Sequence, residues 1–174
     1  MRRGTLVNLK EVVVGIDNGV TGTIAILDRR GNVIHFDKIP TFKEQNYTKK
    51  KGNVTRIAGG QLKEILSMHG VKPAFAYYER PMVNPTRFQA TLSAIRALEA
   101  TLTIIELLQI PYDYIDSKEW QKVMLPNGIK GEADLKKASV DICKRLFPTQ
   151  HEFAVKHGDA DGLLIAEYLR RERK

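Results

Sequence analysis

An apolar run that ends on a carboxylate constrains the fold of this chain more than any other stretch. Residues 12–17 read Val-Val-Val-Gly-Ile-Asp, and residues 18–22, Asn-Gly-Val-Thr-Gly, then break the run. A short run of β-branched residues that ends at a glycine-containing break predicts a buried strand. An ionised carboxylate at the tip of such a strand must be solvated, paired or bound to a cation. We therefore interpret Asp17 as a candidate site residue.

The same pattern occurs a second time. Residues 74–79 read Ala-Phe-Ala-Tyr-Tyr-Glu and are followed by the breaker pair Arg80-Pro81, while apolar residues recur at helical spacing over 57–69. Strand, helix and strand in this order imply a crossover and hence a parallel pair. Asp17 and Glu79 then lie at the carboxyl ends of neighbouring strands, where open α/β sheets keep their sites.

The other segments predict an α/β fold in one domain over residues 1–174. Val- and Ile-rich runs at 12–17, 23–28 and 32–39 are joined by short connections, which predicts an antiparallel meander. A fifth strand is expected at 112–116, and further helices are expected at 86–109, 132–147 and from 161 onward. We expect residues 1–11 to be a basic tail and residues 41–56, after Pro40, to be a basic mobile loop.

The charge balance indicates a polyanionic partner. Lys and Arg number 28 against 20 Asp and Glu, so the formal charge is +8 and the sequence pI is about 9.6. Charge alone leaves nucleic acid and an anionic membrane open. No apolar run approaches the roughly 18 residues of a membrane span, and the run at 12–16 is too short for a signal peptide. We expect an intracellular, soluble protein without membrane association.

Further acids precede the final predicted helix. Asp161 shares a helical face with three apolar residues at i+3, i+4 and i+7, so it points toward the core. Asp159 reaches the same place only from a non-helical position before the helix, and a simple N-cap role also explains it. His157 is either a surface histidine or a ligand. These side chains are candidates to join Asp17 and Glu79.

Carboxylates from two strand ends and a helix start make a site of hard oxygen ligands. Such ligands suit Mg²⁺ or Mn²⁺ and not zinc. In a basic protein, the cations would hold a phosphodiester while the positive surface holds the rest of the polymer, and two ions about 4 Å apart activate water and stabilise the leaving oxygen. The residues therefore predict metal-dependent phosphodiester hydrolysis. Lys49, Lys50 and Lys51 fit either a phosphate-contacting loop or an ordinary solvated loop.

The predicted helix at 86–109 is apolar over most of its girth. Its charged residues fall on one narrow stripe, which leaves two apolar rows. Such a helix is either wrapped within its own domain or packed on a second subunit. We expect a homodimer from this pattern.

Three motifs resemble those of RuvC-type Holliday-junction resolvases, particularly the phage-type branch. They are Gly-Ile-Asp-Asn-Gly-Val-Thr-Gly at 15–22, Tyr-Glu-Arg-Pro at 78–81 and Ala-Asp-Gly-Leu-Leu-Ile-Ala at 160–166; Trp-Gln-Lys at 120–122 and Arg-Leu-Phe-Pro at 145–148 are also similar to that branch. The first motif alone is weak, because sugar kinases and related ATPases open with a similar hairpin. Those enzymes need two such domains, for which this chain is too short.

The resemblance implies a ribonuclease H-like fold with a mixed five-stranded sheet flanked by helices. It also implies a homodimer that nicks two opposing strands of a four-way DNA junction with Mg²⁺, for which Mn²⁺ substitutes. The catalytic and metal-binding roles transfer to Asp17, Glu79 and Asp161. The family's fourth acid falls on Gly158 here, so Asp159, or otherwise His157, is expected to replace it.

DNA-holding lysines of the family lie after the fifth strand, and Lys130, Lys136 and Lys137 occupy that region. Two alternatives stay open at this point. One is a ribonuclease H-like nuclease of other branched DNA or of RNA–DNA hybrid, and the other is a noncatalytic protein that binds DNA junctions.

Overall fold

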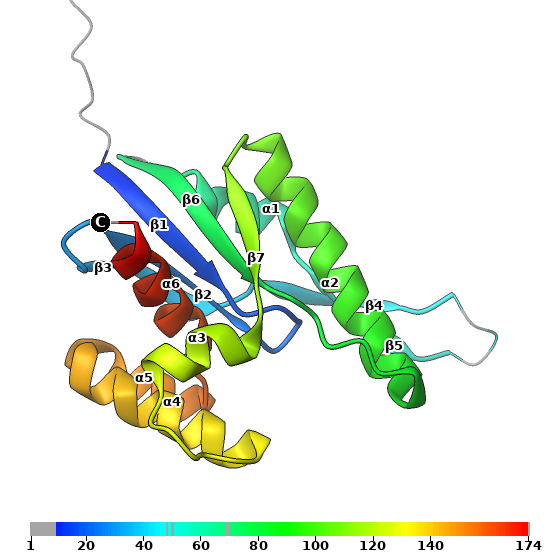
Figure 1. Cartoon of the computed structure of the whole chain (residues 1–174). Helices are drawn as coiled ribbons and strands as arrows, with labels where there is room; N and C mark the ends of the chain where they lie inside the picture. Colours follow the sequence, from blue (N-terminus) through cyan, green and yellow to red (C-terminus); the bar gives the residue numbers. More distant parts are fainter. Residues whose placement is uncertain (1–9, 48, 50, 69, 174) are drawn as a thin grey trace, which may run out of the picture.

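A mixed five-stranded sheet in the order β3-β2-β1-β6-β7 forms the centre of the fold (Figure 1). The structure is a computed structural model that describes residues 10–47, 49, 51–68 and 70–173. The strands of this sheet are β1 (Lys10–Ile16), β2 (Thr23–Asp28), β3 (Val33–Lys38), β6 (Val71–Glu79) and β7 (Tyr112–Ile115). The first three pair antiparallel, and β1, β6 and β7 pair parallel. The predicted α/β class, the meander and the parallel crossover are confirmed.

Helices cover both faces of this sheet. One face carries α1 (Gly59–Leu66) and α2 (Phe88–Leu107), and the other carries α3 (Ser117–Met124), α4 (Glu132–Leu146), α5 (His151–His157) and α6 (Asp161–Glu172); two 3₁₀ turns, η1 (Pro85–Arg87) and η2 (Pro148–Gln150), precede α2 and α5. Strand β1 serves both layers, because Val12 and Val14 pack with the first pair of helices and Val13 with the second group.

Helix α6 lies directly on β1 and β2, and glycines make this approach possible. A Cβ on Gly15 would stand 2.2 Å from the backbone nitrogen of Ala166, and a Cβ on Gly162 would stand 2.4 Å from the carbonyl oxygen of Thr23. Any larger side chain at either position would force the helix away from the sheet. The two glycines therefore hold the start of α6 against the carboxyl end of β1.

The expectation of a loop at 41–56 is wrong. Strands β4 (Thr41–Gln45) and β5 (Asn53–Ile57) form a separate antiparallel hairpin. Phe42 and Val54 lie on one face of the hairpin, as alternation along two strands requires. Most other positions are polar, so this period of two is weak in the sequence. Arg56 lies opposite Phe42, with its guanidinium carbon 5.9 Å from the ring centroid, and pairs with Glu44 at 2.6 Å. These cross-strand contacts stabilise pairing that composition alone does not indicate.

Strand β1 begins earlier than the sequence predicts. Lys10 and Glu11 belong to β1, where they pair with Val71 and Lys72, so the predicted tail at 1–11 is two residues too long; residues 1–9 lie outside the described residues. Within the described residues, every helix falls short of the combination of length and apolar character needed to cross a bilayer.

Candidate active site

The register of β1 and β6 brings the two strand-end acids together. Ile16 lies opposite Tyr78 in the parallel pair, so the next residues, Asp17 and Glu79, emerge side by side from the carboxyl edge of the sheet. Asp17 is 8 % exposed and Glu79 is 9 % exposed. The backbone N–H of Asp17 donates to the carbonyl of Thr23 at 3.0 Å, which fixes the direction in which the strand ends.

The start of α6 supplies two more carboxylates. Helix α5 ends at Gly158, which has φ 63° and ψ 24°, and this left-handed residue turns the chain so that Asp159 precedes α6 in a non-helical position. Asp159 Oδ1 accepts the N–H of Asp161 at 2.8 Å and the hydroxyl of Thr23 at 3.2 Å. Asp159 is not the N-cap residue that one of the two interpretations expected, because Ala160 occupies that position; its Oδ1 nevertheless accepts the first N–H of α6, and its Oδ2 faces the site.

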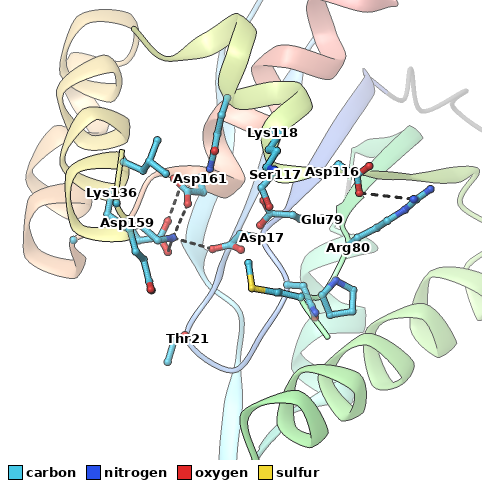
Figure 2. Close-up of a pocket in the computed structure, with 18 of the residues that line it drawn as sticks. Asp17, Thr21, Glu79, Arg80, Asp116, Ser117, Lys118, Lys136, Asp159 and Asp161 are labelled. Carbon is cyan, nitrogen blue, oxygen red and sulfur yellow. Dashed lines mark hydrogen bonds and ion pairs between the residues drawn. The ribbon is translucent and has the colours of Figure 1, made fainter. Parts of the chain in front are cut away.

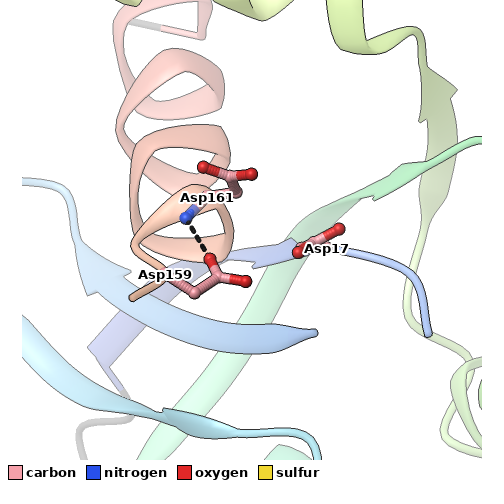
Figure 3. A group of neighbouring side chains, drawn as sticks. All are labelled: Asp17, Asp159 and Asp161. Atoms are coloured by element: carbon pink, nitrogen blue, oxygen red, sulfur yellow. Dashed lines mark hydrogen bonds between the residues drawn. The ribbon is translucent and has the colours of Figure 1, made fainter. Parts of the chain in front are cut away.

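Asp17, Asp159 and Asp161 form a compact cluster (Figure 3). One ligand oxygen from each lies within 4.8 Å of the others, and all three residues are buried. The ammonium group of Lys136 on α4 points into this cluster and lies 2.6 Å from Asp161 Oδ2, 2.8 Å from Asp159 Oδ2 and 3.3 Å from Asp17 Oδ2 (Figure 2). Lys136, considered from the sequence only for DNA, thus neutralises part of the acidic charge.

Burial and mutual repulsion dominate the electrostatics of this cluster. Burial raises the pKa of Asp17 well above its ordinary value; Lys136 opposes the shift, and Glu79 and Asp159 add to it. Burial likewise raises the pKa of Asp161 to about 6, against the influence of Lys136 and with that of Asp159. The pKa of Lys136 is raised although burial opposes it, because Asp17, Asp161 and Asp159 favour its charged form. The cluster therefore has a strong affinity for positive charge.

Glu79 has a hydrogen-bond partner outside the aspartate cluster. The indole nitrogen of Trp120 donates to Glu79 Oε1 at 3.0 Å, and Trp120 is fully buried in α3. A buried donor fixes this carboxylate without neutralising it. The carboxylate of Glu79 lies next to that of Asp17, as Figure 2 shows.

The donor set fits a divalent cation with hard oxygen ligands. Three aspartates within 4.8 Å and the adjacent Glu79 supply carboxylate oxygens, the ligand type of Mg²⁺ and Mn²⁺. Asp161 Oδ1 and the Ser139 hydroxyl are buried without a partner at hydrogen-bonding geometry, although the hydroxyl is near enough to lower the pKa of Asp161. A buried carboxylate oxygen with spare acceptor capacity suits a cation.

The cluster lies on the floor of a cleft of about 1020 Å³. Basic side chains line it alongside the acids: Arg80 after β6, Lys118 at the start of α3 and Lys136 on α4 (Figure 2). Arg80 lies 3.7 Å from Asp116, and both of these side chains are exposed. The exposed acids Asp116 and Glu132 line the same cleft, so its outer part carries charges of both signs, while Lys136 lies among the carboxylates of its floor.

The other predicted site residues lie outside the cluster. His157 also lines the cleft, but it is not one of the three clustered ligands, and its ring packs against Phe153 with centroids 4.2 Å apart. Lys130 and Lys137 are exposed beside a separate depression that runs along α4. Lys49 and Lys51 are exposed at the tip of the β4–β5 hairpin. Lys50 lies outside the described residues.

The structure also shows contributors that the sequence reasoning missed. Thr23 is fully buried; besides its hydrogen bond to Asp159, its hydroxyl accepts the N–H of Gly162 at 3.0 Å. Trp120 was noted only as part of a motif. Its contact with Glu79 depends on how α3 packs against β6. The sequence alone does not give that packing.

Comparison with solved structures shows the same architecture elsewhere. RuvC of Thermus thermophilus in complex with a Holliday-junction substrate is 14 % identical, with a TM-score of 0.60 over 94 % of this chain and 95 % of that one. The chain has the ribonuclease H-like fold of RuvC. A second RuvC structure from the same organism is 13 % identical, with a TM-score of 0.51 over 93 % of this chain and 95 % of the other.

The RuvC-like fold also matches a eukaryotic protein. The yeast mitochondrial Holliday junction resolvase Ydc2 is 18 % identical, with a TM-score of 0.51 over 96 % of this chain and 82 % of Ydc2. No protein-family model and no curated protein sequence matches the chain. The likeness is therefore one of fold, and the chemistry must be argued from the site.

Proposed function

We propose that the chain is a RuvC-type, metal-dependent endonuclease that resolves four-way DNA junctions by paired nicks. The observation that carries the proposal is the convergence of Asp17, Asp159 and Asp161 within 4.8 Å, beside Glu79, in a cleft that Arg80 and Lys118 also line. Of the solved structures that share the fold, RuvC is in complex with a Holliday-junction substrate and Ydc2 is a Holliday junction resolvase. A basic chain with this site fits a branched polyanion as substrate.

In this proposal each side chain has a distinct task. Asp17, Asp159, Asp161 and Glu79 would hold two Mg²⁺ ions, which supply an activated water and stabilise the leaving oxygen. Trp120 keeps Glu79 in position, as its indole hydrogen bond indicates. Arg80 and Lys118 would bind phosphates on either side of the reacting one, because those phosphates need positive partners away from the acids.

Lys136 acts as an internal cation in the same scheme. Its ammonium group holds three aspartates together that would otherwise repel one another. With the carboxylates occupied by divalent cations, the ammonium group would be free to contact a phosphate oxygen. Lys136 would then stabilise the metal-free protein and bind DNA in the loaded one.

Paired nicks require two active sites, and α2 offers a surface for a second copy of the chain. Phe88 is 65 % exposed and Ile95 is 39 % exposed, and they lie two turns apart on one face of the helix. Ala97 and Thr101, from one of the two apolar rows, are buried within the chain and are not available to a partner. We expect Ile95→Glu to give monomers in sedimentation equilibrium, and an unchanged mass would argue against this interface.

The decisive test compares wild type with Asp17→Asn on a mobile four-way junction in Mg²⁺. We expect wild type to nick opposing strands and the variant to lose nicking while it still binds the junction, because phosphate contacts dominate binding. A flap, an RNA–DNA hybrid and a linear duplex serve as competing substrates. Preferred cleavage of one of these would assign the site to another ribonuclease H-like nuclease, and full activity of the variant would reject the metal role.

A noncatalytic junction-binding protein is the second candidate, and Lys136 is the observation that favours it. Because this lysine neutralises part of the charge of the aspartates, the cleft could accept DNA without metal. Junction binding unchanged by EDTA, together with no product in either Mg²⁺ or Mn²⁺, would support this candidate over the nuclease.

A further inference from the structure

The β4–β5 hairpin carries a cationic surface that the cleft does not explain. It projects beside α2, on the opposite side of the molecule from α4 and α5 (Figure 1). Over residues 41–57 the sequence holds five basic residues and one acid, Glu44. That acid pairs with Arg56 at 2.6 Å. The remaining positive charge of the hairpin has no acidic counterpart within the segment.

The two faces of the hairpin differ in chemistry. One face holds Phe42, Glu44, Val54 and Arg56, which include the ion pair and the cation–π contact. The other face holds hydrogen-bonding side chains with one cation and no acid, and at the base of the hairpin it ends at the buried Ile57; these side chains are Thr41, Lys43, Gln45, Asn53 and Thr55. We call this second set the polar face. Most of it is exposed.

The tip of the hairpin, between β4 and β5, is also polar and basic. Tyr47 is 90 % exposed, so its ring is not held by packing against the protein. Lys49 and Lys51 are exposed beside it. Lysine, threonine, asparagine, glutamine and tyrosine are among the side chains that contact phosphate and sugar in DNA complexes. A protein partner would instead call for an apolar centre, which the polar face lacks.

We propose that the polar face and tip of the hairpin bind the phosphate–sugar backbone of a duplex DNA arm. A two-stranded ribbon has the width to lie along or within a groove, and Lys43, Lys49 and Lys51 supply the charge. The proposal rests on the proposed function, since that function places branched DNA in the cleft. The hairpin then holds an arm at a distance from the reacting phosphate and makes affinity depend on arm length.

The test is a matched pair of triple variants. Lys43→Gln, Lys49→Gln and Lys51→Gln remove three charges from the hairpin, and the control Lys72→Gln, Lys144→Gln and Lys156→Gln removes three exposed charges from β6, α4 and α5. Both have the same net charge, so a general charge effect cancels between them. Circular dichroism and thermal unfolding check that each variant is folded.

The readout is junction binding in EDTA as a function of salt concentration. Each phosphate contact adds roughly 0.9 to the slope of log Kd against log salt, so the hairpin variant should lose about 2 to 3 from this slope and bind about a hundredfold more weakly near 0.1 M salt. The control should keep the wild-type slope within about 1. Equal slopes for the two variants would overturn the proposal.

Nicking in Mg²⁺ separates failure of the hairpin from failure of the proposed function. A wild type that nicks junctions, with equal slopes for the two triple variants, would reject the hairpin contact and leave the nuclease. If wild type never nicks, the nuclease proposal is rejected. If in that case the salt slope on a linear duplex falls only for the hairpin variant, the hairpin is still supported as a DNA contact. Hydroxyl-radical footprints should show an arm segment that wild type protects and the hairpin variant leaves exposed.

Discussion

Replacing Lys136 by methionine tests whether the lysine occupies the place of a metal ion. The change keeps most of the aliphatic stem and removes the ammonium group. That group lies within 3.3 Å of three aspartate oxygens, and the lysine side chain is only 33 % exposed. The variant therefore leaves three buried carboxylates without their shared cation.

The size of the effect follows from the burial of these groups. Removing one partner of a buried ion pair costs about 3–5 kcal/mol, because the other charge is left unpaired. Here the lysine is open to the cleft on one side, and the raised pKa values of Asp17 and Asp161 let these carboxyls take up protons instead. We therefore expect Lys136→Met to lower the free energy of unfolding by about 2–3 kcal/mol without metal.

The assay is urea unfolding in EDTA and in saturating Mg²⁺ or Mn²⁺. A divalent cation bound to the same carboxylates replaces the missing charge and stabilises the native state, so the deficit should shrink to below about 1 kcal/mol in metal. Lys137→Met, at the next and exposed position, is the matched control and should stay within about 0.5 kcal/mol of wild type in both conditions. An equal deficit with and without metal would refute the shared position of lysine and metal, and no deficit in EDTA would refute the ion pairs.

Two further substitutions test the supports of the site, and a third serves as a control. Gly15→Ala places a Cβ 2.2 Å from the helix α6 backbone and should cost about 3 kcal/mol or more in urea unfolding. The control Gly60→Ala, with open space around it in α1, should be neutral or stabilise by up to about 1 kcal/mol, and a mild effect at Gly15 would contradict the close helix approach. Trp120→Phe removes the donor to Glu79, so we expect a lower single-turnover nicking rate, a loss of about 1–3 kcal/mol in stability and unchanged junction affinity. A normal rate with weaker binding would show that Trp120 has no positioning role.

The core of the candidate site could be predicted from the sequence because local patterns determine it. Two apolar runs that each end on an acid, separated by a helical segment, imply parallel strands, and parallel strands bring their carboxyl ends to one edge. Asp17 and Glu79 emerge side by side for this reason. The inward face of the last helix likewise indicated Asp161.

The hairpin shows where local pattern fails. Residues 41–57 combine turn-like composition with few apolar residues, so propensity favours a loop. The pairing is stabilised instead by contacts between strands, such as Arg56 with Glu44 and Phe42. Such contacts depend on register, which a single sequence does not specify when neither face is strongly apolar.

The sequence by itself determined three features: the two acids at the carboxyl ends of parallel strands, the inward-facing Asp161 and the positive net charge. Each of them depends on a local period or on composition. Only the tertiary structure shows that Asp159, and not His157, lies in the cluster with Asp17 and Asp161, because the left-handed turn at Gly158 and the buried hydroxyl of Thr23 direct Asp159 there. It also decided the place of Lys136, which is 25 residues from Asp161 in sequence and 2.6 Å from it in space. A contact of that kind follows from how α4 packs against α6, and no local period of either helix contains that information.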